Sequence, residues 1–372
     1  MSAAPSPRPS PPAHHLLIPF AACASEAWPQ AMQDLPPDHL RHLGKLLQGM
    51  KPAHTDHGDV HSLSTPHERV LAQAFGLPIA DGLIPWAAWQ HLQAGGEPAG
   101  KAWAHITPCC WAMGREHATL TDPAALGLQE AESRTLLAAM QPYFESGNIT
   151  LHYVEPTRWL AQGEVFRTLP SASLDRVLGR NVDAWLPGAG NVKAEKFSAE
   201  ATVRSEGPPQ ASTAPSSSER GSVTPEAHAV ASVGARSMRL LQNEMQMLLY
   251  THPINDARAA KGLLTVNSFW ISGTGALPAS FHREALPDVQ VPRGLAQAAF
   301  NDDWAAYAQA WAALDAGEVA DLLQRQRSGE AVRLTLCGER GAQTFETAHS
   351  GLFSKISSLF KPEPLWNVLK QL

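Results

Sequence analysis

The chain has 372 residues, which is enough for about two domains of ordinary size. Hydrophobic residues make up 44% of it and charged residues 17%, so it can fill a core and carries fewer charges than an average soluble protein. Its formal net charge of −6 argues against a broad basic surface for nucleic acid, and no apolar run approaches the roughly 20 residues that span a bilayer. Four cysteines without a C-x-x-C pair do not make a disulfide framework and favour a reducing, cytoplasmic location.

The N-terminus allows two interpretations. Residues 1–15 form a polar, proline-rich tail, which we expect to be disordered. The short apolar stretch 16–22 resembles the core of a signal peptide, with Cys23 near a cleavage site. A signal peptide normally has a more basic start and no proline such as Pro19 in its apolar run, so we predict a buried first strand instead.

Helical and extended patterns then alternate along the first half of the chain. Apolar residues over 40–50 have helical spacing, with Asp38 as the expected cap. A capping box at Thr65 and Glu68 predicts a helix that ends at Gly76. Later patterns predict, in chain order, a helix at 84–92, an extended segment at 103–111, a helix at 130–144 and a hairpin with strands at 149–153 and 159–160.

The composition changes at 188–235, which is rich in Ser, Ala, Pro and Thr and which we interpret as a flexible linker. Beyond it the patterns predict a helix from Arg236, a strand at 266–271, helices within 304–323, a strand at 332–336 and an amphipathic helix at 352–360. This alternation indicates a layered α/β architecture. We expect residues 16–187 and 236–372 to pack together as one unit.

One polar stretch has the composition of a metal site. His54, Asp56, His57 and His61 offer imidazole and carboxylate groups, which suit Zn²⁺ or Mn²⁺. Their Thr-Asp-His-Gly segment is similar to a metal-binding signature of the alkaline-phosphatase superfamily, in which it follows a buried strand late in the chain. Here it follows Pro52 near the N-terminus, so we favour a solvated polar loop and keep a metal site as the alternative.

The segment Ser272-Gly273-Thr274-Gly275 follows a predicted strand and is the most suggestive loop. Glycines let backbone N–H groups approach an anion, and the two hydroxyls add donors. The segment is neither a phosphate-binding Walker loop nor a complete dinucleotide fingerprint. We expect it to bind a small phosphorylated or carboxylated ligand, and a tight structural turn is the alternative.

Polar residues shortly before this strand complete the candidate set. His252, Asn255 and Arg258 are separated from the strand by a short connection, which could bring them to the edge where the loop lies. Termination of a helix and a solvent-facing surface would explain the same residues. The candidate ligand-binding residues are therefore Asn267, Ser272, Gly273, Thr274, Gly275, His252, Asn255 and Arg258.

Six stretches carry a family resemblance: Leu17–Ala21, Gly76–Gly82, Ile106–Cys109 with Trp111, Leu241–Leu249, Asn267–Gly275 and Leu334–Gly338. Together they resemble the proteobacterial RpfE-type regulatory protein family, whose members are described as phosphoglycerate-mutase-like. The resemblance covers most of 16–187 and 236–345 and leaves out the linker.

Within it, Asn267 and Trp270, followed by Pro278 and Arg293, are similar to a segment of the archaeal-type, cofactor-independent phosphoglycerate mutases. That resemblance implies an alkaline-phosphatase-like fold, with a mixed or parallel sheet flanked by helices, two divalent metals and a transiently phosphorylated serine. The chain departs from this pattern because it has no Asp-Gly loop after its first strand, no Asp-His pair in its C-terminal half and no serine in a matching context. No catalytic residue is therefore assigned.

Three functions fit the sequence. The first is a catalytically degenerate, mutase-like protein without a cofactor and with a regulatory or small-anion-binding role, which we favour. The second is an active phosphoglycerate mutase or phosphatase that depends on Mn or Zn. The third is an adaptor that binds a protein partner through exposed Trp and Pro.

Overall fold

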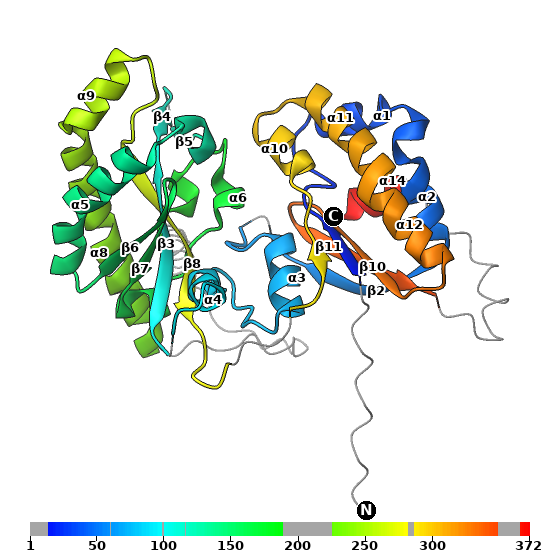
Figure 1. The fold of residues 1–372 in the computed structure, drawn as a ribbon, viewed down its shortest axis with the longest axis horizontal. Coiled ribbons are helices and arrows are strands. Elements are labelled where there is room, and N and C mark those ends of the chain that lie inside the picture. Colours follow the sequence, from blue (N-terminus) through cyan, green and yellow to red (C-terminus); the bar gives the residue numbers. More distant parts are fainter. Residues whose placement is uncertain are drawn as a thin grey trace, which may run out of the picture. The chain divides into compact units, whose positions relative to one another are not determined.

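The computed structural model describes residues 14–59, 61–98, 100–115, 117–188, 225–281, 286–348 and 365–372. The chain forms two compact units, and Figure 1 follows their elements along the sequence. Unit 1 comprises Met1–Leu77 and Glu284–Leu372, and unit 2 comprises Pro78–Arg283. Most of the predicted tail and linker, and the helix predicted at 352–360, lie outside the described residues.

Unit 1 contains a mixed five-stranded sheet, sheet A, with the strand order β2-β11-β10-β1-β9. Strand β1 is parallel to β9 and to β10, whereas β11 is antiparallel to both β10 and β2. The predicted first strand is confirmed, and its neighbours on both sides explain its continuous apolar sequence. The strands are β1 (His14–Ile18), β2 (Met50–His57), β9 (Val289–Gln290), β10 (Val332–Cys337) and β11 (Gly341–Thr347).

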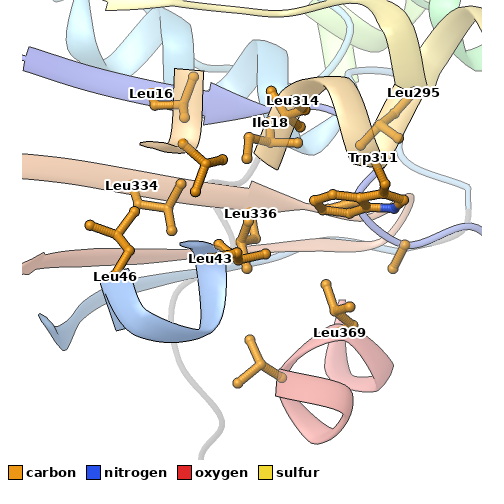
Figure 2. Packing of buried hydrophobic residues seen from close by; sticks show 14 of the residues in the cluster. Leu16, Ile18, Leu43, Leu46, Leu295, Trp311, Leu314, Leu334, Leu336 and Leu369 are labelled. Carbon is orange, nitrogen blue, oxygen red and sulfur yellow. The ribbon is translucent and has the colours of Figure 1, made fainter. Parts of the chain in front are cut away.

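Successive side chains of these strands point to opposite faces of sheet A, and helices cover one of the two faces. Figure 2 shows Leu16 and Ile18 of β1 and Leu334 and Leu336 of β10 among the buried residues of this core. Side chains of α2 (Arg41–Gln48), α11 (Trp304–Leu314), α12 (Ala320–Arg327) and α14 (Leu365–Gln371) complete it, including Leu43, Trp311, Leu323 and Leu369. The alternate residue Leu17 packs instead with Val70 of α3 (Pro66–Ala74). The remaining helices described in this unit include α1 (Trp28–Gln33) and α10 (Gly294–Phe300).

The N-terminus of α2 is capped from a distant part of the chain. Asp38 lies in a short 3-10 helix before α2, so its prediction as the cap was wrong. The cap is buried Asp315, whose carboxylate accepts hydrogen bonds from the backbone N–H groups of His42 at 3.0 Å and Leu43 at 2.8 Å. Asp315 begins a π-helical segment, Asp315–Val319, between α11 and α12.

Unit 2 is built on a four-stranded antiparallel sheet, sheet B, with the order β6-β7-β3-β8. Helices α5 (Glu130–Ser146) and α8 (Pro225–Tyr250) cover one face, and α4 (Trp86–Gln93) packs on the other (Figure 1). The strands are β3 (Ala102–Cys109), β6 (Thr150–Glu155), β7 (Arg158–Gln162) and β8 (Ser268–Ala276), and the predicted hairpin is β6–β7. Smaller elements are β4 (Trp111–Met113), β5 (Ala118–Leu120), α6 (Leu174–Val177) and α9 (Pro253–Ala260).

The layered α/β class is confirmed, but the chain is divided elsewhere than predicted. Pairing of β1 with β10 and of β3 with β8 joins segments far apart in sequence, so each unit closes through long-range contacts. Residues 225–235 belong to the 26-residue helix α8 and not to a linker. None of the helices in the described part of the chain is both long and apolar enough to cross a membrane.

Candidate functional site

The predicted anion-binding loop is part of a strand. Ser272 and Gly275 lie within β8, which continues to Ala276, and they pair with His105 and Trp103 of β3. The register shifts between these two pairs, which indicates a bulge. Long-range pairing with β3 therefore keeps the glycine-rich segment extended, which the local sequence did not predict.

Both glycines of this segment allow the start of α4 to approach the strand closely. Gly273 has φ +61°, and a Cβ atom there would lie 3.0 Å from Cβ of Trp86 and from Nδ1 of His105. A Cβ atom at Gly275, with φ +140°, would lie 3.0 Å from the carbonyl oxygen of Leu83. Glycine is thus required by backbone conformation and packing at these two positions.

The hydroxyl group of Thr274 is occupied within unit 2. Thr274 is fully buried, and its Oγ1 lies 2.7 Å from the carbonyl oxygen of Leu169, 3.0 Å from that of Gly82 and 2.9 Å from Oγ of Ser171. Ser272 is also buried. These contacts tie β8 to two preceding loops and give Thr274 a structural role.

Helix α9 holds the other end of β8. Arg258, whose exposed fraction is 1%, donates to Leu264 O at 2.8 Å, to Glu132 Oε2 at 2.7 Å and to the carbonyl oxygen of Leu126. Asn255 Nδ2 donates to Val266 O at 2.7 Å and its Oδ1 accepts from Val266 N at 2.9 Å. These hydrogen bonds hold the segment between α9 and β8 in place.

His252 and Asn267 also have local partners. Nδ1 of His252 accepts from the backbone N–H of Ile254 at 3.3 Å and caps α9. The side chain of Asn267 bonds to both backbone groups of Trp111. The structure therefore does not bring the predicted set to one edge, because α9 lies at the start of β8 and Thr274 near its end, roughly 25 Å away at about 3.3 Å per residue.

The metal candidates lie on and beside an edge strand. His54, Asp56 and His57 belong to β2, which pairs with β11, so the expectation of a polar loop was wrong for these three residues. His61 follows in the next turn. Arg69 holds the carboxylate of Asp56 through Nε at 3.0 Å and Nη2 at 2.5 Å. Within the described residues, no three His, Cys, Asp or Glu side chains form a group that could hold a metal ion.

Polar residues gather instead at the carboxyl edge of sheet A, the edge at which β1, β9 and β10 end. Strand β2 ends at the same edge because its last residue, His57, pairs with Gly341, which closely follows β10. Helices α3 and α10 begin after β2 and β9. In open α/β sheets ligands bind at this edge. The side chains of interest are Thr65, His67 and Arg293, together with Phe20.

Phe20 is central to the carboxyl edge. It follows β1 with φ +55°, a left-handed conformation that is uncommon outside glycine and is enriched at ligand sites. The hydroxyl of Tyr307 donates to its carbonyl oxygen at 2.7 Å and holds this turn. Its ring centroid lies 5.9 Å from that of His67 and 4.9 Å from that of Phe300. The guanidinium carbon of Arg293 lies 5.9 Å from the Phe300 centroid, so both polar side chains adjoin one aromatic pair.

The first turn of α3 completes this region. The predicted capping box is present: the Thr65 side chain accepts from the N3 backbone, and Glu68 accepts from the backbone of Thr65. His67 is 4% exposed, and its Nε2 lies 3.2 Å from Oγ1 of Thr65. His67 adjoins the ring of Phe20 and Arg293 adjoins the ring of Phe300, and a guanidinium group suits a small anion. The sequence signal for this site was two helix starts, at Pro66 and Gly294, each following a strand.

Two further histidines, buried His15 and half-buried His105, have hydrogen-bond partners inside the units. His15 Nε2 lies 2.8 Å from Oγ1 of Thr335, and His105 Nε2 lies 2.7 Å from Oε1 of Gln90. Burial and, to a smaller extent, the charges of Arg333 and Arg158 respectively lower the pKa of each to about 3. Both imidazoles are therefore neutral at pH 7 and serve as hydrogen-bonding groups inside the units.

A hollow of about 130 Å³ lies between β2, β11 and α14 in unit 1. Apolar side chains supply much of its lining, among them Leu47, Met50, Phe345 and Val368. Because it offers no guanidinium or ammonium group, it suits a small anion less well than the carboxyl edge does.

No family model and no curated protein matches the chain. Among solved structures, it is similar to a cofactor-independent phosphoglycerate mutase from Thermoplasma acidophilum DSM 1728, with 12% identity, a TM-score of 0.34 and coverage of 97% of this chain and 99% of that one. It is also similar to the PH0037 protein of Pyrococcus horikoshii, with 12% identity, a TM-score of 0.33 and coverage of 92% and 88%. Both TM-scores are low, and the α/β class rests on the chain's own strands and helices.

Proposed function

We propose that the protein binds a small phosphorylated or carboxylated anion at the carboxyl edge of sheet A and has a regulatory role without phosphoryl transfer. The observation that carries this proposal is the approach of Arg293 and His67 to the Phe20–Phe300 pair where three parallel strands end. Arg293 supplies a permanent positive charge, and the hydrogen-bonded pair of His67 and Thr65 supplies one further donor.

The ion pair of Asp56, a candidate metal ligand, supports a role without phosphoryl transfer. Asp56 is engaged by Arg69, whose Nη1 also donates to Ser64 O at 2.6 Å. A carboxylate held by two donors of one guanidinium is already neutralised and oriented. The regulatory part rests on the RpfE-type stretches of the sequence, one of which, Leu17–Ala21, contains Phe20.

Calorimetric titration with phosphate and with phosphoglycerates tests this proposal. Arg293→Gln and His67→Gln should each weaken binding at least about tenfold, because each removes a charged or buried donor. Arg134→Gln, at an exposed ion pair with Glu130, is the matched control and should leave binding unchanged. If no anion binds, or if both variants bind like the unchanged protein, the proposal is wrong. Turnover of a phosphoglycerate with Mn²⁺ would favour the catalytic alternative.

A further inference from the structure

Helix α8 has two apolar faces, and only one of them is buried. Met238, Leu241, Met245 and Leu249 belong to the core on sheet B. On the other face Val233, Leu240 and Met247 follow one another at intervals of seven residues and are 64%, 60% and 72% exposed. Seven residues are close to two helical turns, so these three side chains form one stripe along α8.

A groove runs beside this stripe. It has a volume of about 460 Å³, and its lining includes Tyr143 of α5, Val165, and Val233 and Leu240 of α8. Glu244 of α8 also lines it. A stripe of large apolar side chains next to an apolar groove is typical of a surface that another protein segment covers.

The order of residues on the exposed face is self-complementary. In two antiparallel copies of α8 related by a two-fold axis at Leu240, residues at equal distances from Leu240 in opposite directions meet. Val233 then meets Met247 of the second copy, Arg236 meets Glu244 and Ser237 meets Asn243, so these pairs join apolar to apolar, positive to negative and polar to polar. Both Arg236 and Glu244 are exposed in the single chain. A parallel arrangement would instead place Arg236 against Arg236.

We propose that the exposed face of α8 is the interface of an isologous homodimer, with a two-fold axis at Leu240 and Leu240 of each copy meeting at that axis. A two-fold interface uses the same patch on both copies and therefore needs this kind of self-complementarity. The groove beside the stripe receives the apolar side chains of the second copy. This inference is independent of the proposed anion site, which lies in unit 1.

The chain's own residues 189–224 are the competing occupant of the groove. They connect Gly188, which lies next to Ala235, with the start of α8. Their sequence contains a single aromatic residue, Phe197, and no periodic apolar pattern, so it offers little to fill an apolar groove. A second copy of α8 offers three large apolar side chains and two oppositely charged ones, and is the better complement.

Sedimentation velocity of the full chain tests the dimer. We expect a dimer at a concentration of about 100 µM, and a dissociation constant that Leu240→Glu raises at least about thirtyfold, as for the central residue of an interface. Met113→Glu, at an 80% exposed apolar residue away from α8, is the control and should leave the dimer intact. Arg236→Glu should weaken the dimer, and the double variant Arg236→Glu with Glu244→Arg should restore it.

Oxidative cross-linking locates the axis. Leu240→Cys should form a disulfide-linked dimer, because the two copies of residue 240 meet, whereas Met113→Cys should not. Of the native thiols, Cys109, Cys110 and Cys337 are buried and Cys23 is partly buried, so the Met113→Cys variant also measures the background from Cys23. A monomer at all concentrations up to several hundred micromolar overturns the proposal. A dimer that persists in Leu240→Glu also overturns it, and so does one that appears only after deletion of 191–222, because that result would place this segment in the groove.

Discussion

The carboxyl edge of sheet A and the second half of β8 contain the same kinds of residues and use them differently. Both have a hydroxyl side chain and a residue with positive φ, and each unit also has an arginine, Arg293 at the carboxyl edge and Arg258 at the start of β8. In β8 the hydroxyl of Thr274 and the guanidinium of Arg258 are consumed by bonds to carbonyl and carboxylate oxygens of unit 2. At the carboxyl edge the chain leaves the sheet, and Arg293 and His67 adjoin an aromatic pair.

Residue type and spacing alone did not reveal whether a strand ends at these residues or continues through them. Pairing with β3 carries β8 through Gly273 and Gly275, so the polar groups face packed elements. Strand β1 ends at Ile18, and the left-handed Phe20 redirects the chain at once. A substitution of Arg258, a pair of glycine substitutions and a pair of histidine substitutions test how buried polar groups and close packing stabilise the two units.

The largest effect is expected for Arg258→Met. The variant leaves Glu132 and two carbonyl oxygens without their buried partner, so the free energy of unfolding should fall by about 3–5 kcal/mol in a urea titration. Arg134→Met, at an exposed pair, is the control and should change it by no more than about 1 kcal/mol. A small change in stability combined with weaker phosphate binding would mean that Arg258 belongs to a ligand site.

A pair of glycine substitutions should give the next largest effect. Gly262 and Gly273 have φ values of +68° and +61°, but no atom lies within 4 Å of a Cβ added at Gly262. Gly262→Ala should therefore lower the free energy of unfolding by about 1–2 kcal/mol, through backbone strain alone. Gly273→Ala should cost about 1–3 kcal/mol more, because its Cβ crowds Trp86 and His105. Equal losses in urea unfolding would contradict the close packing of α4 on β8.

His15 and His105 should make both units less stable in acid. Their folded pKa of about 3 lies below the ordinary 6.5, so the unfolded chain takes up a proton that the folded chain does not. Stability is therefore full above pH 6.5 and falls as the pH drops from 6.5 towards 3, by roughly 1.4 kcal/mol per pH unit for each histidine.

Unfolding titrations between pH 7 and pH 4 measure this slope. His15→Gln and His105→Gln should each reduce it by about the contribution of one histidine. Because the two sites lie in different units, their effects should add in the double variant, and each single variant is the control for the other. An unchanged slope in both variants would mean that these imidazoles are charged in the folded protein.

Local patterns predicted much of the fold. The capping box at Thr65, the hairpin of β6 and β7, and strands β1 and β10 were visible because each depends on residues close in sequence. The predicted α/β class followed from their alternation. The chain's division into units could not be predicted, because it depends on which distant strands pair, as β3 does with β8.

The candidate site was harder to predict for the same reason. Strand β2 was interpreted as a polar loop because an edge strand with an exposed face lacks a continuous apolar pattern. Without β2 and β11, nothing indicated that Thr65 and His67 begin their helix at the edge where β1 and β10 end. Arg293 was noticed only through the family resemblance, and its place beside Phe300 follows from the fold.

The account's central claim is that the anion site lies at the carboxyl edge of sheet A and that the second half of β8 is structural. Phosphate calorimetry and thermal unfolding of Arg293→Gln and Thr274→Val test it in one experiment. Arg293→Gln should weaken phosphate binding at least about tenfold with an unchanged melting temperature, because Arg293 is partly exposed. Thr274→Val should lower the free energy of unfolding by about 1–3 kcal/mol with unchanged binding, because it removes a buried hydroxyl and its hydrogen bonds. The opposite pattern, with weakened binding in Thr274→Val and unchanged binding in Arg293→Gln, would contradict the claim.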